Sequence, residues 1–148
     1  MATDTLPADF APYPNAGDYY FQTLGELYAR PQEGGLLVLG LHLQQRHCNR
    51  LGIPHGGMLA TLADGALGIN VHLALQPGPT MVTVNLSLDY LAAAKVGDWL
   101  EAHVTLRKLG RQLAFGDCVL RVVEREVLRA TGIFATVARV LRMTPTEG

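Results

Sequence analysis

The spacing of hydrophobic and polar residues changes near residue 80. Before that point, the segment from about His55 to Leu75 is apolar on nearly all sides, which predicts a helix surrounded by protein. After it, residues 81–90 alternate strictly between apolar and polar, which predicts a strand. One face carries Val82, Val84, Leu86, Leu88 and Tyr90, and the other carries Thr83, Asn85, Ser87 and Asp89.

The chain beyond this strand predicts three more strands at hairpin spacing. Residues 99–108 alternate in the same way, a turn at Leu109–Gly110 leads into residues 111–123, and residues 124–141 close the series. A further strand is predicted before the helix, at Gly34–Gln45. An α+β fold, in which an antiparallel β-sheet wraps around a long central α-helix, satisfies both periods.

The N-terminal part predicts less regular structure. Residues 1–15 read as a loosely ordered arm. A short helix over about Ala16–Leu24 would be capped by Asn15 and ended by Gly25. Four aromatic side chains are expected to pack this helix against the sheet, namely Tyr19, Tyr20, Phe21 and Trp99.

Composition narrows the class of protein. With 148 residues, 49% of them hydrophobic, and no repeat or linker, residues 1–148 are expected to form one domain. The net charge of −1 argues against nucleic acid as a partner. Without a signal-peptide pattern, and with polar residues inside the apolar helix, no membrane association is expected. The two cysteines, Cys48 and Cys118, form no CxxC pair, so we expect a cytoplasmic protein without a zinc site.

The stretch "NRLGIPHGGMLATLADGALG", residues 49–68, carries the candidate chemistry. Asp64 is an acid in an otherwise apolar helix, which costs free energy unless the carboxylate is paired or hydrogen-bonded. Gly56 and Gly57 stand at the first turn, where backbone N–H groups lack intrahelical partners. Glycine lets a ligand oxygen come close, so this turn suits a carbonyl that becomes an oxyanion.

The spacing of these groups predicts a dimer. Gly56 and Asp64 are eight positions apart, which separates them by ~12 Å along one helix. One carbonyl group cannot touch both. If both act, Asp64 must face the glycine turn of a second chain, so a twofold homodimer would hold two composite sites.

Several other catalytic classes are disfavoured by the sequence. Ser87 is the only serine and lies in a strand, not in a GxSxG elbow. There is no phosphate-binding loop of the GxxxxGK type and no HExxH metal motif.

The stretch resembles the signature of hotdog-fold acyl-CoA thioesterases, in particular the phenylacetate-degradation (PaaI-type) group. The resemblance covers about Gly25 to Leu141. Thr83 matches a hydroxyl residue of the family's next strand, and "KLGRQLAF" is similar to its CoA-contacting turn. The matching positions are Asn49, Gly52, His55, Gly56, Gly57 and Asp64, followed by Thr83, Lys108, Gly110 and Arg111.

The resemblance implies hydrolysis of acyl- or aroyl-CoA thioesters to free acid and CoA. It also implies a hotdog fold, a homodimer or homotetramer, no metal and no cofactor beyond the CoA of the substrate. The implied catalytic residues are Gly56, whose N–H polarises the carbonyl; His55, which steadies the turn; Asp64 of the partner subunit, as base or nucleophile; Asn49, near the acid or the carbonyl; and Thr83, which helps to place water. The implied substrate contacts are Gly57, Lys108, Gly110 and Arg111.

Other interpretations of the same residues stay open. A hotdog dehydratase would be expected to carry a DxNxxH arrangement, which is absent. A non-catalytic acyl-CoA sensor is a further alternative, although this chain keeps Asp64. Asp64 could also be a structural acid, and aromatic and medium-chain acyl groups both fit the pattern.

Overall fold

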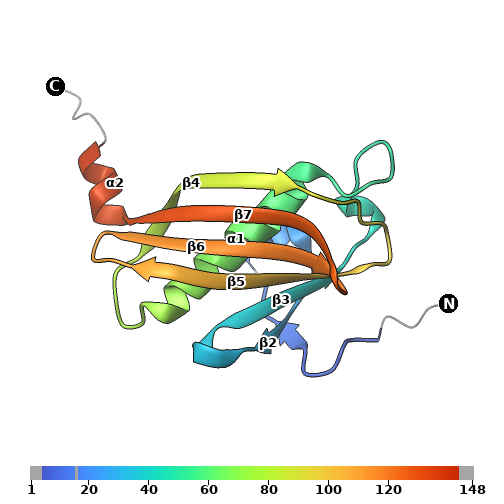
Figure 1. Cartoon of the computed structure of the whole chain (residues 1–148), viewed down its shortest axis with the longest axis horizontal. Coiled ribbons are helices and arrows are strands. Elements are labelled where there is room, and N and C mark those ends of the chain that lie inside the picture. Colours follow the sequence, from blue (N-terminus) through green and yellow to red (C-terminus); the bar gives the residue numbers. More distant parts are fainter. Residues whose placement is uncertain (1–4, 16, 144–148) are drawn as a thin grey trace.

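The computed structural model describes residues 5–15 and 17–143. In these parts of the chain, a seven-stranded antiparallel sheet of order β1-β2-β3-β5-β6-β7-β4 has the long helix α1 (Gly56–Ala74) against one face (Figure 1). This arrangement confirms the α+β fold expected from the sequence. The strands are β1 (Ala11–Tyr13), β2 (Leu27–Pro31), β3 (Leu37–His42), β4 (Met81–Tyr90), β5 (Trp99–Leu109), β6 (Leu113–Val122) and β7 (Arg125–Thr136). The shorter elements are η1 (Tyr20–Leu24), η2 (Glu33–Gly35), η3 (Gln45–His47) and α2 (Val137–Met143).

The expected loose arm is partly a strand. Residues 11–13 form β1, which pairs with β2, a strand that the sequence did not predict. The buried Phe10 packs edge-on against Trp99, with ring centroids 5.0 Å apart. The arm is therefore tied to the sheet by backbone pairing and by an aromatic contact, while residues 1–4 lie outside the described part.

The expected short helix is a 3-10 turn, η1, and Ala16 at its expected start lies outside the described residues. Asn15 does not cap the N-terminus of this turn. Its Nδ2 instead donates to the carbonyl oxygens of Phe21 at 3.2 Å and of Gly25 at 2.9 Å. The side chain thus satisfies acceptors near the end of η1.

The aromatic side chains near η1 separate into different environments. Phe21 lies on α1 at Gly65, where a Cβ atom would stand 2.1 Å from the Phe21 ring. Tyr19 and Tyr20 are exposed, so of these three aromatic side chains Phe21 alone packs against α1. Trp99 contacts Phe10 and other rings of β2 and β3 rather than η1. The prediction that these four aromatic side chains together pack the short helix against the sheet is therefore wrong.

The helix α1 is anchored in the sheet by a pair of glycines. Gly116 of β6 and Gly132 of β7 lie directly opposite each other, and Leu67 of α1 packs into the space that they leave. A Cβ atom on Gly132 would lie 2.9 Å from one Leu67 methyl group, and one on Gly116 would lie 3.0 Å from the other. The buried face of α1 consists of Leu59, Leu62, Ala63, Ala66, Leu67, Asn70 and Val71.

Asn70 joins this buried face to β3. Its Oδ1 accepts from the Leu37 N–H at 2.8 Å, and its Nδ2 donates to the Leu37 carbonyl at 3.0 Å and to that of Ala66 at 2.9 Å. The polar side chain is fully buried, so these bonds offset the cost of removing it from water.

Replacing Asn70 by alanine is expected to lower the free energy of unfolding by about 2–4 kcal/mol, because backbone groups of Leu37 lose their partners. Urea denaturation monitored by circular dichroism measures this change. His72→Ala, at an exposed position of α1, is the control and should stay within about 0.5 kcal/mol of wild type. Equal stability of the two variants would contradict the assignment.

Candidate functional site

The glycine turn that begins α1 is held by the preceding residue. His55 Nδ1 accepts a hydrogen bond from the Gly57 N–H at 2.8 Å, and the His55 N–H donates to the His47 carbonyl at 2.8 Å. His55 is therefore the N-cap of α1. Among the residues that the structure describes, none accepts from the Gly56 N–H, which as the first helical residue has no intrahelical partner.

Tyr90, the last residue of β4, holds the same turn from the sheet. Its hydroxyl donates to the Gly56 carbonyl oxygen at 2.6 Å, and a Cβ atom on Gly56 would lie 3.3 Å from the Tyr90 ring and hydroxyl. The sequence indicated only that Tyr90 ends an alternating strand. The contact with Gly56 was missed, because it depends on how β4 passes the start of α1.

Asp64 is half-buried and hydrogen-bonded rather than enclosed in the apolar core. Its Oδ1 accepts from the Thr83 hydroxyl of β4 at 2.7 Å. This bond meets the expectation that an acid in an apolar helix is hydrogen-bonded, and Asp64 lies on a half-buried face of α1 beside the sheet. A carboxylate in this position keeps a second oxygen for other contacts.

A β-bulge directs Thr83 toward this carboxylate. Strict alternation placed Thr83 on the same face as Asn85, but the register shifts between them, so that Thr83 pairs with Phe134 and Asn85 with Ile133. Phe134 is buried in the core under α1, so the bulge at Val84 brings Thr83 to the helix side. The predicted face of Thr83 was therefore wrong.

Strand pairing places the two halves of the predicted chemistry at opposite ends of the sheet. Following the paired residues from β4 across β7 and β6 to β5, Thr83 aligns with Leu109. The β5–β6 hairpin at this end of the sheet also carries Lys108, Gly110 and Arg111. Tyr90 is level with the other end of these strands. Within one chain, Asp64 and Thr83 thus lie on the hairpin side, and the Gly56 turn lies ~12 Å away along α1.

The remaining predicted residues lie in the loop before α1, at the end of β5 and in the turn after it. Asn49 Oδ1 accepts from the backbone N–H groups of Leu51 at 2.9 Å and Ile53 at 3.3 Å, so it braces its own loop and does not contact Asp64. The Gly110 N–H donates to the Leu113 carbonyl at 2.7 Å and closes the β5–β6 turn. The long cationic side chains at that turn, Lys108 and Arg111, are both exposed.

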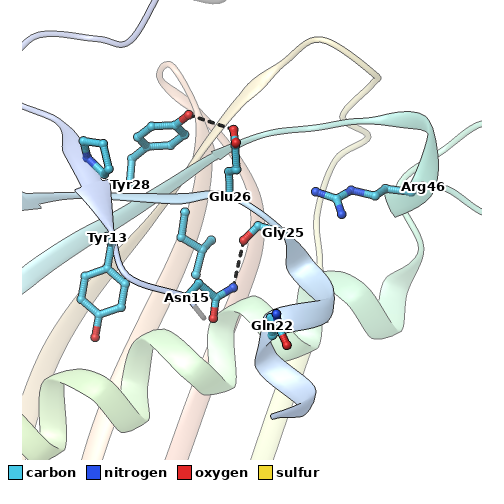
Figure 2. Close-up of a pocket in the computed structure, with 9 residues that line it drawn as sticks. Tyr13, Asn15, Gln22, Gly25, Glu26, Tyr28 and Arg46 are labelled. Carbon is cyan, nitrogen blue, oxygen red and sulfur yellow. Dashed lines mark hydrogen bonds between the residues drawn. The ribbon is translucent and has the colours of Figure 1, made fainter. Parts of the chain in front are cut away.

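Two hollows lie on either side of η1. One, of about 340 Å³, lies between η1 and the first turns of α1 and is lined by His55, Gly57 and Arg46 among others. The other, of about 540 Å³, lies between η1, β1 and β2 (Figure 2) and also includes Arg46, but none of the predicted site residues. Only the smaller hollow adjoins the glycine turn.

Other chemically active side chains serve structure. Both nitrogens of the buried His47 are used, since Nδ1 accepts from the Gln44 N–H at 2.9 Å and Nε2 bonds to the Leu24 carbonyl at 2.8 Å. Burial raises the pKa of the Cys118 thiol to about 12, so this thiol stays neutral.

In residues 5–15 and 17–143, no three His, Cys, Asp or Glu side chains gather as metal ligands. Over the same residues, no helix is both long and apolar enough to cross a membrane.

Comparison with known sequences gives a family. Residues 51–128 match the model of the thioesterase superfamily. A Pseudomonas aeruginosa protein that carries the general name esterase is 43% identical over 111 residues, which are 75% of this chain and 83% of that protein. Acyl-coenzyme A thioesterase 13 of Mus musculus is 30% identical over 81 residues, which are 55% of this chain and 57% of the mouse protein.

Comparison with solved structures finds thioesterases with a similar fold. Zebrafish thioesterase superfamily member 2 has a TM-score of 0.75 at 24% identity, covering 81% of this chain and 88% of that one. A hypothetical thioesterase of Streptococcus pneumoniae, solved with coenzyme A, has a TM-score of 0.70 at 26% identity and covers 76% and 90%. The Escherichia coli PaaI protein has a TM-score of 0.68 at 22% identity and covers 75% and 79%. The chain therefore belongs to the thioesterase superfamily, and its helix-covered antiparallel sheet is the hotdog fold of that family.

Proposed function

We propose that this protein hydrolyses acyl- or aroyl-CoA thioesters to the free acid and CoA, at composite sites shared by two chains. One observation carries the proposal: a Gly56 N–H without a partner at the start of α1, and a Thr83-bonded Asp64 eight residues further along the same helix. The names of the mouse relative and of the CoA-bound pneumococcal structure support the substrate class.

The chemistry follows from the two groups. The thioester carbonyl oxygen would accept from the Gly56 N–H, and the positive end of the helix dipole would stabilise the charge that develops there. Asp64 of the second chain would either attack the carbonyl carbon or take a proton from an attacking water. In the general-base route, water adds to the carbonyl carbon, the C–S bond breaks, and the proton held by Asp64 passes to the leaving thiolate to give CoA and the free acid. In the nucleophilic route, breakage of the C–S bond leaves a mixed anhydride on Asp64 and a thiolate that takes a proton from solvent, and a water then hydrolyses the anhydride to the free acid and restores Asp64. Thr83, by donating to Asp64, would fix the orientation of the carboxylate.

The edge of the sheet supports the dimer. β4 is a terminal strand of the sheet, ten residues long, and its Val82 and Val84 are exposed. Such an edge is a template for pairing with another chain. If β4 pairs antiparallel with a second copy about a centre between residues 86 and 87, Thr83 comes opposite the copy's Tyr90. Because Tyr90 holds Gly56, this register brings Asp64 close to the second chain's glycine turn.

Thiol release from a panel of phenylacetyl-, hydroxybenzoyl- and straight-chain acyl-CoAs tests the activity. We expect wild type to release CoA from at least one class and thereby to rank the acyl groups. Failure on every thioester would overturn the proposal, and binding without release would favour a sensor.

Complementation tests the composite site. We expect Gly56→Pro and Asp64→Asn homodimers to be almost inactive. A heterodimer purified with two different tags should recover about half of the wild-type rate, because one of its two sites has both groups intact. A heterodimer as inactive as both parents would show that Gly56 and Asp64 do not act across the two chains.

A further inference from the structure

Arg46 is an exposed cation with no acidic partner in the part of the chain that the structure describes. It belongs to η3, and its guanidinium lies over Gly25, where a Cβ atom would stand 1.6 Å from Nη2 and 2.4 Å from Cζ (Figure 2). Gly25 has φ +81°, a conformation that favours glycine. The Arg46 Nε donates to Gln44 Oε1 at 2.9 Å. Across the described residues, no carboxylate lies within ion-pair distance of Arg46.

Arg46 lies where the two hollows beside η1 meet. It lines the hollow of about 340 Å³ together with His55 and Gly57, and also the hollow of about 540 Å³ on the other side of η1. The next residue, His47, accepts from the His55 N–H at 2.8 Å, so the turn that carries Arg46 is bonded to the glycine turn. A ligand held at the Gly56 N–H can therefore extend along a defined path toward this cation.

The shape and polarity of this path fit the CoA part of a thioester. The smaller hollow combines the hydroxyl groups of Thr23 and Thr61 with the apolar side chain of Met58, a mixture that suits the amide-containing pantetheine arm. We propose that Arg46 binds a phosphate of the CoA nucleotide, in the same chain whose Gly56 N–H receives the thioester carbonyl. A guanidinium pairs with phosphate oxygens through two parallel hydrogen bonds. The inference rests on the function proposed above.

The larger hollow suits the adenine base of CoA rather than its phosphate groups. Glu26 lies in it and accepts from the Tyr28 hydroxyl at 3.2 Å (Figure 2). A carboxylate repels phosphate, including the 3′-phosphate on the CoA ribose, but it accepts hydrogen bonds from the adenine amino group. Charge along the path thus changes from cationic at Arg46 to anionic at Glu26, which sets the direction of the bound nucleotide.

This assignment differs from the contacts implied by the family resemblance at Lys108 and Arg111. Lys108 lines a hollow of about 460 Å³ that also includes Phe115 and Ile133. These side chains alternate along β6 and β7 with the buried residues that face α1, so this hollow opens on the opposite face of the sheet from Asp64. Within one chain, Arg46 thus lines a hollow beside the Gly56 turn, whereas the hollow of Lys108 lies on the face of the sheet away from α1.

Binding of CoA to the full-length protein, measured by isothermal titration calorimetry at two salt concentrations, tests the inference without requiring hydrolysis. We expect Arg46→Gln to weaken binding of CoA about tenfold and to reduce its salt dependence, because a charge-assisted pair is lost. Arg50→Gln, on the neighbouring exposed loop, is the matched control and is expected to stay within about twofold. Lys108→Gln tests the competing contact implied by the family resemblance. Arg46→Lys should recover part of the loss, since it keeps the charge but not the fork of donors.

A thioester of pantetheine, which lacks the nucleotide, separates phosphate binding from a change in the shape of the site. The Arg46→Gln variant should show a raised KM for the acyl-CoA and an unchanged KM for the acyl-pantetheine. An equal loss on both substrates, an unchanged affinity for CoA, or a loss carried by Lys108→Gln would each overturn the inference. Wild type that binds CoA through Arg46 yet hydrolyses no thioester would refute the proposed function alone. Active wild type with an unaffected Arg46→Gln variant would refute the inference alone.

Discussion

The Asp64→Asn variant is expected to keep its fold and to lose about a thousandfold in kcat, since a positioned base or nucleophile contributes roughly 10²–10⁴-fold. Asparagine has nearly the same shape, and its Oδ1 can still accept from the Thr83 hydroxyl, so the local geometry should persist. What is lost is the negative charge. The measurement is steady-state thiol release, accompanied by thermal unfolding and size-exclusion chromatography to show that fold and assembly are unchanged.

The matched control for this variant is Asp89→Asn. Asp89 is an exposed carboxylate on β4, the strand that carries Thr83, and by its register it faces away from α1. The kcat of the Asp89→Asn variant should stay within about twofold of wild type, because this substitution removes one negative charge from the protein surface, away from α1. If Asp64→Asn were as active as Asp89→Asn, the carboxylate of Asp64 would be structural.

The Gly56→Pro variant is expected to lose about 100- to 1000-fold in kcat, the usual cost of removing one oxyanion donor. Proline has no backbone N–H, and the first helical position is the one place in a helix that tolerates it. His55 has φ −65° and ψ 133°, the extended conformation that a residue before proline requires. The substitution therefore removes the proposed donor while leaving α1 able to form, which thermal unfolding can check.

The control at the same position is Gly56→Ala, which keeps the N–H. Its added methyl group would lie 3.3 Å from the Tyr90 side chain, a close but adjustable contact, so we expect a loss of less than about tenfold. An equally large loss in both variants would assign the effect to the displaced Tyr90 contact and not to the missing donor.

The sequence predicted correctly the elements in which hydrophobic residues follow one clear pattern along the chain. The helix expected from about His55 to Leu75 runs from Gly56 to Ala74, and the four strands after it are present. β1 and β2 were missed because they are short, contain or adjoin prolines and do not alternate clearly. Their pairing depends on β3 and on the buried Phe10, which are contacts far apart in the chain.

The sequence predicted which residues form the candidate site, but not the directions in which their side chains point. The motif identified Gly56, Asp64 and Thr83, and the structure joins the last two by a hydrogen bond. It could not show that Thr83 faces α1, because a bulge adds one residue without interrupting the alternating pattern in the sequence. Tyr90 and Arg46 were missed for a related reason, since one lies in an ordinary strand and the other among polar loop residues.

The glycine pair under Leu67 has a consequence for catalysis as well as for packing. Leu67 lies one turn after Asp64, so the depth to which its side chain enters the space between Gly116 and Gly132 sets where the carboxylate stands along β4. The packing of this apolar side chain therefore also fixes the position of the acid one turn before it. In the proposed composite site, a methyl group added at Gly132 would displace the Asp64 carboxylate relative to the second chain, so we expect a change in the core to be detected first as a change in rate.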